Sequence, residues 1–308
     1  MDLRDLHYFE TIAELEHVGK ASEVLRRTQP TLTACVRRLE QQYGLPLFER
    51  AGRGIRLTAA GAALRAWARR LRLDAEGAAS ELSDIAQGSA GHIRIGIVPT
   101  AARFLLPPVA RMLLADAPRV TMKTIVALND TLRPLLRAGE LDLTISTDSY
   151  REAGYVSKIV AQDTVVVAVS SGHPLLRHKG LKIGDLVDLG WVLQPPGAPT
   201  RQWLDQTFDH HGLPRPRVQI EANMLLMLPP LIAETGLPTF LSRQHLAPLQ
   251  QGAGLQELPL KETTMNRRLV ITYRENGYHS EAVKRLHALM LQIGPTVFRK
   301  EGNSKRRT

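Results

Sequence analysis

The stretch Thr28-Gln29-Pro30-Thr31-Leu32-Thr33 decides the fold of the amino-terminal region, residues 18–61. Thr28 is a good N-cap residue, because its hydroxyl can accept a hydrogen bond from a free amide of the first helical turn. Pro30 falls in that turn, where a missing N–H has little effect. A helix is therefore predicted to begin here and to run to about Tyr43, where Gly44 provides a left-handed end.

The two faces of this predicted helix differ in chemistry. One face has the three- and four-residue spacing of a buried stripe: Leu32, Val36, Leu39 and Tyr43. The other face carries small, polar or cationic side chains and no acid: Pro30, Thr33, Ala34, Arg37 and Gln41. Such a face suits a helix in the major groove of DNA, because bulky side chains would obstruct it and acidic ones would repel phosphate.

A shorter helix is predicted over Lys20–Arg26, with Ala21, Val24 and Leu25 pointing inward. Three residues, Arg26-Arg27-Thr28, join it to the next helix, which is the length of the turn in a helix-turn-helix. Any pair of short amphipathic helices could show this pattern, so charge is needed as a second criterion.

Positive charge is concentrated around this helix pair. Residues 26–72 contain eleven Arg and no Lys, against only two acids, whereas residues 1–25 contain six acids and two bases. A basic block around a candidate recognition helix is the electrostatic footprint of a DNA-binding domain.

The whole chain has 308 residues, a net charge of +10 and a pI near 10.0, which favour a polyanionic partner but also fit a membrane surface. No apolar run is long enough to span a bilayer, and the first residues do not form a signal peptide, so we expect a cytoplasmic protein. The single cysteine, Cys35, excludes an internal disulfide and a multi-cysteine metal site. Its place on the inward side of the helix predicts packing and not reactivity.

The order of patterns predicts a multidomain α+β chain. Residues 1–58 are expected to form a winged helix-turn-helix domain, with the helix-turn-helix at about 18–37 and a glycine-rich wing that presents Arg50, Arg53 and Arg56. Residues 59–90 are expected to form a long linker helix and a hinge. The apolar heptad Leu64, Leu71, Ala78 and Ile85 predicts dimerisation through that helix, with packing on its own chain as the alternative.

Residues 91–298 alternate strands with helices, which predicts two α/β lobes with a parallel sheet. Within them, the helical pattern from Met224 to Glu234 is interrupted by Pro229-Pro230, so we expect a break there. The basic tail, residues 299–308, is expected to be disordered.

The chain resembles the LysR-type transcriptional regulators over essentially its full length. The likeness rests on a set of amino-terminal residues and on two stretches of the second half: Phe9, Ala21, Leu25, Gln29-Pro30, Arg38-Leu39-Glu40, Gly44, Leu47-Phe48, Arg50, Arg53, Leu57-Thr58, Gly61, Leu136 and Gly139–Ile145. The resemblance implies a winged helix-turn-helix, a linker helix and a two-lobed effector domain like a periplasmic binding protein. It also implies a bacterial homo-oligomer, a dimer of dimers on promoter DNA, with a small-molecule co-inducer, no cofactor and no metal, and with RNA polymerase as a further partner.

Some positions depart from the family pattern. Val18-Gly19-Lys20 stands where Gly-Ser-Phe is common, Ala21-Ser22 replaces an Ala-Ala pair, and Thr33 replaces a frequent Ser. These changes leave the fold prediction intact but make the DNA half-site less predictable. The interruption Leu228–Pro230 looks like the subgroup that resembles regulators of sugar or aryl-sulfonate metabolism.

By matching positions, the resemblance assigns base-edge contacts to Gln29, Pro30, Thr33 and Ala34, and phosphate contacts to Thr31, Arg37, Arg50 and Arg53. The physics agrees, because Gln can bond adenine in a bidentate manner and the methyl groups of Ala and Thr can pack on thymine.

The effector site is predicted from strand ends. Ligands of open α/β sheets bind beyond the carboxyl ends of strands, where helix N-termini present free amides. The residues at such places are Thr100, Ala101, Asn129, Thr147, Thr200 and Phe240. Each alone could be an ordinary cap or core residue, but as a group they favour a site. Helix N-termini favour an anion, so a carboxylate or sulfonate effector is our hypothesis.

Two other functions remain open from the sequence. An α/β enzyme acting on a small anionic metabolite is one, although the chain has no nucleophile elbow, phosphate loop or dinucleotide fingerprint. The adjacent His210-His211 would point in different directions on a helix and lack further ligands, so they are expected to be surface or capping residues. The other is a basic DNA-binding protein without sequence preference, which would not need the large second half.

Overall fold

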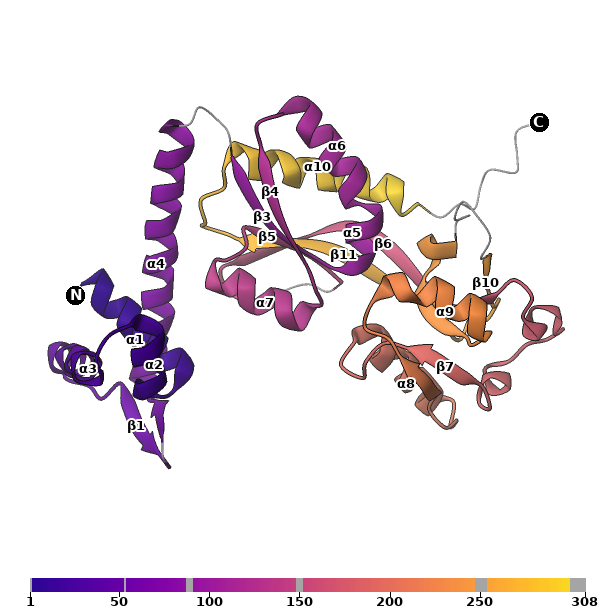
Figure 1. Cartoon of the computed structure of the whole chain (residues 1–308), viewed down its shortest axis with the longest axis horizontal. Coiled ribbons are helices and arrows are strands. Elements are labelled where there is room, and N and C mark those ends of the chain that lie inside the picture. Colours follow the sequence, from indigo (N-terminus) through magenta and orange to yellow (C-terminus); the bar gives the residue numbers. More distant parts are fainter. Residues whose placement is uncertain (1, 53, 87–90, 148–151, 247–253, 300–308) are drawn as a thin grey trace. The chain divides into compact units, whose positions relative to one another are not determined.

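The computed structural model describes residues 2–52, 54–86, 91–147, 152–246 and 254–299, except for the side chains of 80, 81, 83–86 and 226. The chain divides into two compact units: Met1–Ser89 with Asn276–Ser280, and Ala90–Glu275 with Glu281–Thr308 (Figure 1). Arg53, the hinge residues 87–90, the tail from residue 300 and the side chain of Ile85 lie outside the described residues, and the predictions for them stay predictions.

The first unit contains four helices and one antiparallel hairpin in its described part. Their bounds are α1 (Leu3–Leu15), α2 (Val18–Leu25), α3 (Gln29–Tyr43), β1 (Phe48–Ala51), β2 (Gly54–Leu57) and α4 (Ala59–Ala86). The helices pack around a small core that includes Phe9, Ile12, Leu32 and Leu39, none more than 1% exposed. This is the winged helix-turn-helix followed by a long helix that the sequence predicted.

Local chemistry fixes the ends of α3 and the start of α4. The hydroxyl of Thr28 accepts a hydrogen bond from the amide of Thr31 at 3.4 Å, and Gly44 ends the helix with φ at 65°. The hydroxyl of Thr58 accepts from the amide of Gly61 at 3.0 Å, which caps α4. A Cβ on Gly61 would lie 2.0 Å from the carbonyl oxygen of Leu47, so only glycine allows this close approach.

Two side chains that the sequence placed inward are exposed instead. Val24 is 66% exposed and Tyr43 is 42% exposed. Tyr43 is the last residue of α3, where the stripe runs past the small core. Helix α2 has only 8 residues, and Ala21 is its only buried side chain. By contrast, Cys35 is fully buried, as predicted.

In the described part of the second unit, nine strands form one sheet, in the order β4-β3-β5-β11-β6-β9-β7-β8, with β10 paired to β6. The strands are β3 (His92–Ile97), β4 (Thr121–Val126), β5 (Leu143–Ser146), β6 (Tyr155–Ser170), β7 (Gly190–Leu193), β8 (Arg217–Glu221), β9 (Thr239–Ser242), β10 (Leu255–Glu257) and β11 (Met265–Arg274). The helices are α5 (Pro99–Phe104), α6 (Leu106–Asp116), α7 (Asn129–Ala138), α8 (Pro199–His210), α9 (Leu228–Thr235) and α10 (Glu281–Val297). Short 3₁₀ turns are Pro174–Arg177, Ile183–Leu186, Leu225–Met227 and Arg243–Leu246.

The sheet is mixed, so the prediction of a parallel sheet was wrong for its middle. Strands β3, β4 and β5 are parallel to one another, as are β7, β8 and β9, but β6 and β11 pair antiparallel between these two groups. The first half of β6 packs into one hydrophobic core with Val160, and its second half packs into another with Val167. Two long strands therefore connect two α/β lobes.

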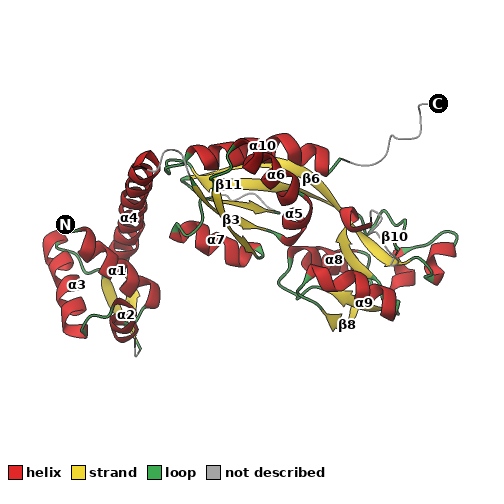
Figure 2. Cartoon of the chain, turned by 45° about the horizontal axis from the view of Figure 1, so that its top comes forward, coloured by secondary structure: helices red, strands yellow, loops and turns green. Residues whose placement is uncertain are grey.

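Helices cover both faces of the sheet in the first lobe. Figure 2 shows α6 and α10 together on one side of the strands and α7 on the other. The helical pattern predicted from Met224 to Glu234 is divided, as expected, into a 3₁₀ turn, Leu225–Met227, and α9. Pro229 and Pro230 lie in the first turn of α9, where a missing N–H has little effect.

Candidate functional site

The outer face of α3 is a continuous exposed surface. Gln29, Pro30, Thr33, Ala34 and Arg37 are all exposed, and together with Arg38 and Gln41 they line a shallow hollow. Their counterparts on the inner face, Leu32 and Leu39, are buried. The exposed residues present small or polar groups, so nothing large projects from the centre of this surface.

The arginines around this surface fall into two groups. Arg38 donates to Asp5 at 2.7 Å and Arg56 donates to Glu49 at 2.6 Å. Arg37 and Arg50 are exposed, and within the described ranges neither makes an ion pair. The hydrogen bond from Arg38 lowers the pKa of the Asp5 carboxyl below its ordinary value. Arg37 and Arg50 can therefore neutralise an external anion without losing an internal partner.

The two acids of this region are engaged with the protein itself. An oxygen of Glu40 accepts from the backbone amide of Leu47 at 2.8 Å, and Glu49 holds Arg56. The hydroxyl of Thr31, which the sequence assigned to phosphate, is exposed and lies 2.8 Å from the hydroxyl of Thr28. The surface thus has little negative charge to oppose a polyanion.

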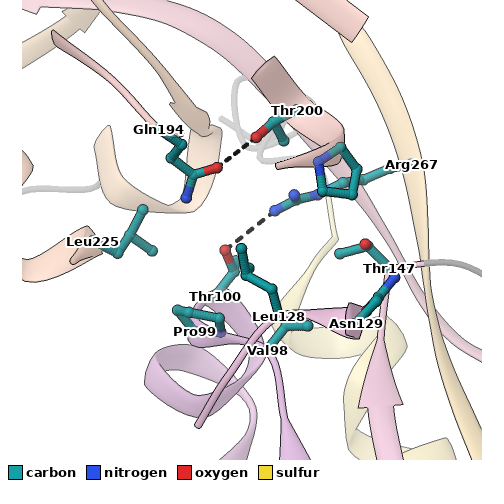
Figure 3. A pocket seen from close by; sticks show the side chains of 11 residues that line it. Val98, Pro99, Thr100, Leu128, Asn129, Thr147, Gln194, Thr200, Leu225 and Arg267 are labelled. Atoms are coloured by element: carbon teal, nitrogen blue, oxygen red, sulfur yellow. Dashed lines mark hydrogen bonds between the residues drawn. The ribbon is translucent and has the colours of Figure 1, made fainter. Parts of the chain in front are cut away.

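In the second unit, side chains from both lobes meet around a cavity (Figure 3). Thr100, Asn129, Thr147 and Thr200, four of the six predicted effector residues, all line it. An inner hollow of about 30 Å³ opens near an adjoining space of about 500 Å³ that shares Asn129, Thr147 and Thr200. Three strand ends and one helix start thus converge as the sequence predicted.

The other two predicted residues are not in the lining, and this part of the prediction is corrected. Ala101 is fully buried in α5, one residue past Thr100, so its side chain faces the core of the first lobe. Phe240 lies inside β9, not at its end, and stacks on Trp203 with ring centroids 5.6 Å apart. Both side chains are apolar, and packing in the core removes more of their surface from water than a place in the cavity lining would.

The main residue that the sequence did not reveal is Arg267 on β11. Its side chain is 11% exposed and donates to Asp163, which is 1% exposed, at 2.7 Å. It also donates to the hydroxyl of Thr100 at 3.1 Å, while Ser242 donates to the other oxygen of Asp163 at 2.6 Å. The guanidinium of Arg267 on β11 therefore links Asp163 on β6 to Thr100 in α5.

Other lining residues that sequence reasoning missed are Gln194 and Leu225, and at the outer part Arg133 and Arg268. Gln194 accepts a hydrogen bond from Thr200 at 2.6 Å. It follows the carboxyl end of β7, so the rule that found Asn129 could have found it as well. No such rule could have found Arg267, because its strand runs antiparallel to those whose ends form the cavity.

Comparison with known proteins decides the family. Residues 3–62 match the family model described as bacterial regulatory helix-turn-helix protein, lysR family, and residues 86–294 match the LysR substrate binding domain. The chain belongs to the LysR family. It is a DNA-binding transcriptional regulator with an effector-binding domain, as its curated relatives are named transcriptional regulators. The family and these relatives are regulators and not enzymes, which decides against the enzyme that the sequence left open.

Several relatives span most of this LysR regulator. It is 30% identical over 246 residues to the HTH-type transcriptional regulator GbpR of Azospirillum brasilense, covering 79% of this chain and 72% of the relative. It is 26% identical to the hydrogen peroxide-inducible genes activator of Haemophilus influenzae, covering 89% and 91%.

Solved structures share the fold. Full-length OxyR from Pseudomonas aeruginosa matches with a TM-score of 0.65 at 24% identity, covering 97% of each chain. CbnR in complex with its target DNA matches with a TM-score of 0.57 at 21% identity, covering 95% of this chain and 99% of CbnR. The regulatory domain of Synechocystis CcmR in complex with 2-PG matches with a TM-score of 0.60 at 20% identity, covering 66% and 97%. At these identities the likeness concerns the fold alone.

In the part of the chain that the structure describes, no helix combines the length and apolar character needed to cross a bilayer. No group of three or more His, Cys, Asp or Glu side chains among the same residues could hold a metal ion.

Proposed function

We propose that the outer face of α3 lies in the major groove of promoter DNA. Gln29, Pro30, Thr33 and Ala34 would contact base edges, and Thr31, Arg37, Arg50 and Arg53 would contact the phosphate backbone. The observation that carries this proposal is the pair of exposed arginines without ion pairs, Arg37 and Arg50, beside a surface of small side chains. Arg53 takes part by its position in the sequence, since it lies outside the described residues.

Replacing Gln29 by Ala separates base reading from backbone contact. A bidentate bond to one base contributes about 1–3 kcal/mol of discrimination, whereas a phosphate contact carries no sequence information. In fluorescence anisotropy, Gln29→Ala should therefore lose affinity for the DNA upstream of its own gene and keep its affinity for random duplex. Arg53→Ala should weaken both alike and lower the salt slope by about 1. Equal losses on both duplexes for Gln29→Ala would favour a protein without sequence preference.

For the effector, we propose a small anion such as a carboxylate or sulfonate, held between the two lobes by Thr100, Asn129, Thr147 and Thr200, with Arg267, which Asp163 holds in place, as a charged hydrogen-bond donor. Two observations support the anion: Arg267 faces the cavity, and α7 and α8 begin at it without a side-chain cap. A third supports a ligand that also carries a donor group, because the buried amide oxygen of Asn129 has no hydrogen-bond partner among the described residues.

Calorimetry can test the charge of the effector. The full chain is titrated with small carboxylates and with the matching neutral amides. The proposal expects heat from at least one carboxylate and at least tenfold weaker binding of its amide, because the amide removes the attraction to Arg267. Amides that bind as tightly as the acids would contradict an anionic effector.

We also propose that the regulator works in the cytoplasm as a dimer through α4, and as a dimer of dimers on DNA, with RNA polymerase as a partner in transcription. Trp67 is 59% exposed and Leu82 is 68% exposed on α4, although both are apolar. Next to Trp67, a mainly apolar hollow is lined by Tyr43, Leu45, Leu47, Ala60, Ala63, Leu64 and Leu71. Exposed apolar area of this kind favours association with a second copy. Trp67→Glu should shift sedimentation towards the monomer, and an unchanged oligomer would contradict a dimer formed through α4.

A further inference from the structure

Helix α2 begins in an unusual way, with a histidine as its N-cap. Nδ1 of His17 accepts a hydrogen bond from the backbone amide of Lys20 at 3.2 Å. A ring nitrogen that accepts carries no proton, so in the neutral imidazole the proton resides on the other nitrogen, Nε2. His17 is exposed. The cap bond thus fixes a neutral N–H donor on the protein surface.

This imidazole lies beside the residue proposed to read the first base. A Cβ added to Gly19 would be 2.9 Å from Cε1 of His17 and 3.3 Å from Nε2 of Gln29. The two side chains are therefore no more than about 6 Å apart and flank the same glycine. Gly19 is in the helix, so its role here is to leave space and not to adopt a special backbone angle.

We propose that His17 is a further DNA-binding residue, which donates from Nε2 to a backbone phosphate next to the base read by Gln29, and that Gly19 keeps the space for it. The inference rests on the proposed function of α3. In a helix-turn-helix, the N-terminal residues of the second helix contact base edges while the first helix crosses the phosphate backbone. The start of α2, next to Gln29, is therefore where a phosphate oxygen is expected, and the exposed Lys20 adds positive charge there.

A purely structural role does not account for this choice of residue. Ser, Thr, Asp and Asn are the side chains that cap helices best, and they need no glycine two residues later to make room. A histidine adds a second ring nitrogen, Nε2, that the cap bond does not use. In an exposed side chain that nitrogen can donate to an external acceptor.

The test uses His17→Asn in the full chain, because Asn preserves a strong cap and removes the outward donor. The probe is a random-sequence duplex, since a phosphate contact does not depend on base sequence. We expect the dissociation constant to rise about three- to tenfold, as for the loss of one hydrogen bond. The melting temperature should not fall. The slope of log K against log salt should be unchanged, because the lost donor is neutral.

His7→Asn is the matched control, the same exchange at an exposed position on α1. It should leave DNA affinity unchanged. Gly19→Ala should weaken binding in the wild type, since the new Cβ displaces the ring, and should have a smaller effect in the His17→Asn background. Because Ala is the better helix former, Gly19→Ala should not lower the melting temperature.

The outcomes separate this inference from the proposed function. If the wild type binds no duplex at all, the role of α3 in DNA binding fails. If the wild type binds and His17→Asn binds equally well, or if its loss comes with a lower melting temperature, the phosphate contact is contradicted. A salt slope that falls by about 1 would show a cationic contact instead of the neutral donor proposed here.

Discussion

Arginine has opposite environments in the two units of this regulator. On the α3 surface, Arg37 and Arg50 are exposed and make no ion pair within the described ranges. In the cavity between the two lobes, Arg267 is 11% exposed and paired with the buried Asp163. A solvated cation retains its rotamer freedom and can follow a regular row of phosphates, whereas a buried cation must have a partner to offset its desolvation.

The difference shows what each site needs. A DNA surface works through several weak, long-range attractions, so loosely held charges suffice. A cavity for a small molecule needs a few groups at fixed positions. Asp163 and Ser242 hold the guanidinium in place, and Arg267 in turn holds the hydroxyl of Thr100. Changes at Arg267 or its partner should therefore affect stability, and changes at Arg37 should affect DNA binding alone.

The largest stability effect is expected for Asp163→Asn. It leaves the Arg267 cation buried without a counter-charge, which destabilises by about 3–5 kcal/mol. Urea unfolding followed by tryptophan fluorescence measures it, because Trp191 and Trp203 both lie in the second unit. Asp209→Asn is the matched control, since it breaks the exposed pair with Arg215, which water and salt screen, and its effect should be much smaller. Similar losses for the two variants would contradict the distinction between buried and solvated arginines.

A pH effect is expected at His245, which is 2% exposed and lies edge-on to Phe104. Burial lowers the pKa of this imidazole from 6.5 to about 4, and the charges of Arg103 and Arg267 add to the shift. The unfolded chain therefore binds more protons than the folded one between these values. Stability should fall as the pH drops from about 6.5 to about 4, by up to about 3 kcal/mol.

The contribution of His245 is isolated by comparing the wild type with His245→Leu at each pH. The difference in unfolding free energy between the two proteins should change across this window and stay constant above it. A constant difference at every pH would show that His245 is not the group responsible.

A smaller effect, on DNA affinity and its salt dependence, is expected when Arg37→Ala is compared with Arg38→Ala. Arg37 is available for phosphate, so its loss should weaken binding to random duplex and lower the salt slope by about 1. Arg38 is committed to Asp5, so its loss should change the slope less. Anisotropy titrations at several salt concentrations give both slopes. Equal slopes for the two variants would mean that ion pairing does not decide which arginine contacts DNA.

Peroxide treatment is expected to leave the DNA affinity unchanged, although several relatives are named hydrogen peroxide-inducible genes activators. The second unit contains no cysteine, and the one in the chain, Cys35, is buried with its pKa raised to about 12 by that burial. Since the thiolate is the reactive form, oxidation should be very slow. DNA affinity should remain within about twofold after peroxide treatment, with Cys35→Ala as the control. A larger change that disappears in Cys35→Ala would contradict this.

The α3 surface could be predicted from sequence because it lies on one contiguous helix. A cap at Thr28, a stop at Gly44 and the helical period fix which side chains face out. The apolar stripe predicted Leu32 and Leu39 correctly. It failed for Val24 and Tyr43, because periodicity shows which face is apolar and not how far the core extends along it.

The lining of the cavity between the two lobes could be predicted only in part. Thr100, Asn129 and Thr147 follow parallel strands, so a rule about strand ends finds them. Arg267 enters from an antiparallel strand, and its partner Asp163 is 104 residues away in the chain. Pairings between distant segments leave no local pattern. Ala101 and Phe240 show the converse error, since a place near a strand end does not determine where a side chain points.

One variant tests the central claim most directly: Ala34→Glu. Ala34 is exposed in the middle of the α3 surface, and Glu is a good helix former, so the fold and the melting temperature should not change. A carboxylate at this point would face the DNA backbone and bases without a partner. Anisotropy with duplex DNA should show at least a hundredfold loss of affinity. Unchanged binding by a folded Ala34→Glu protein would contradict the account.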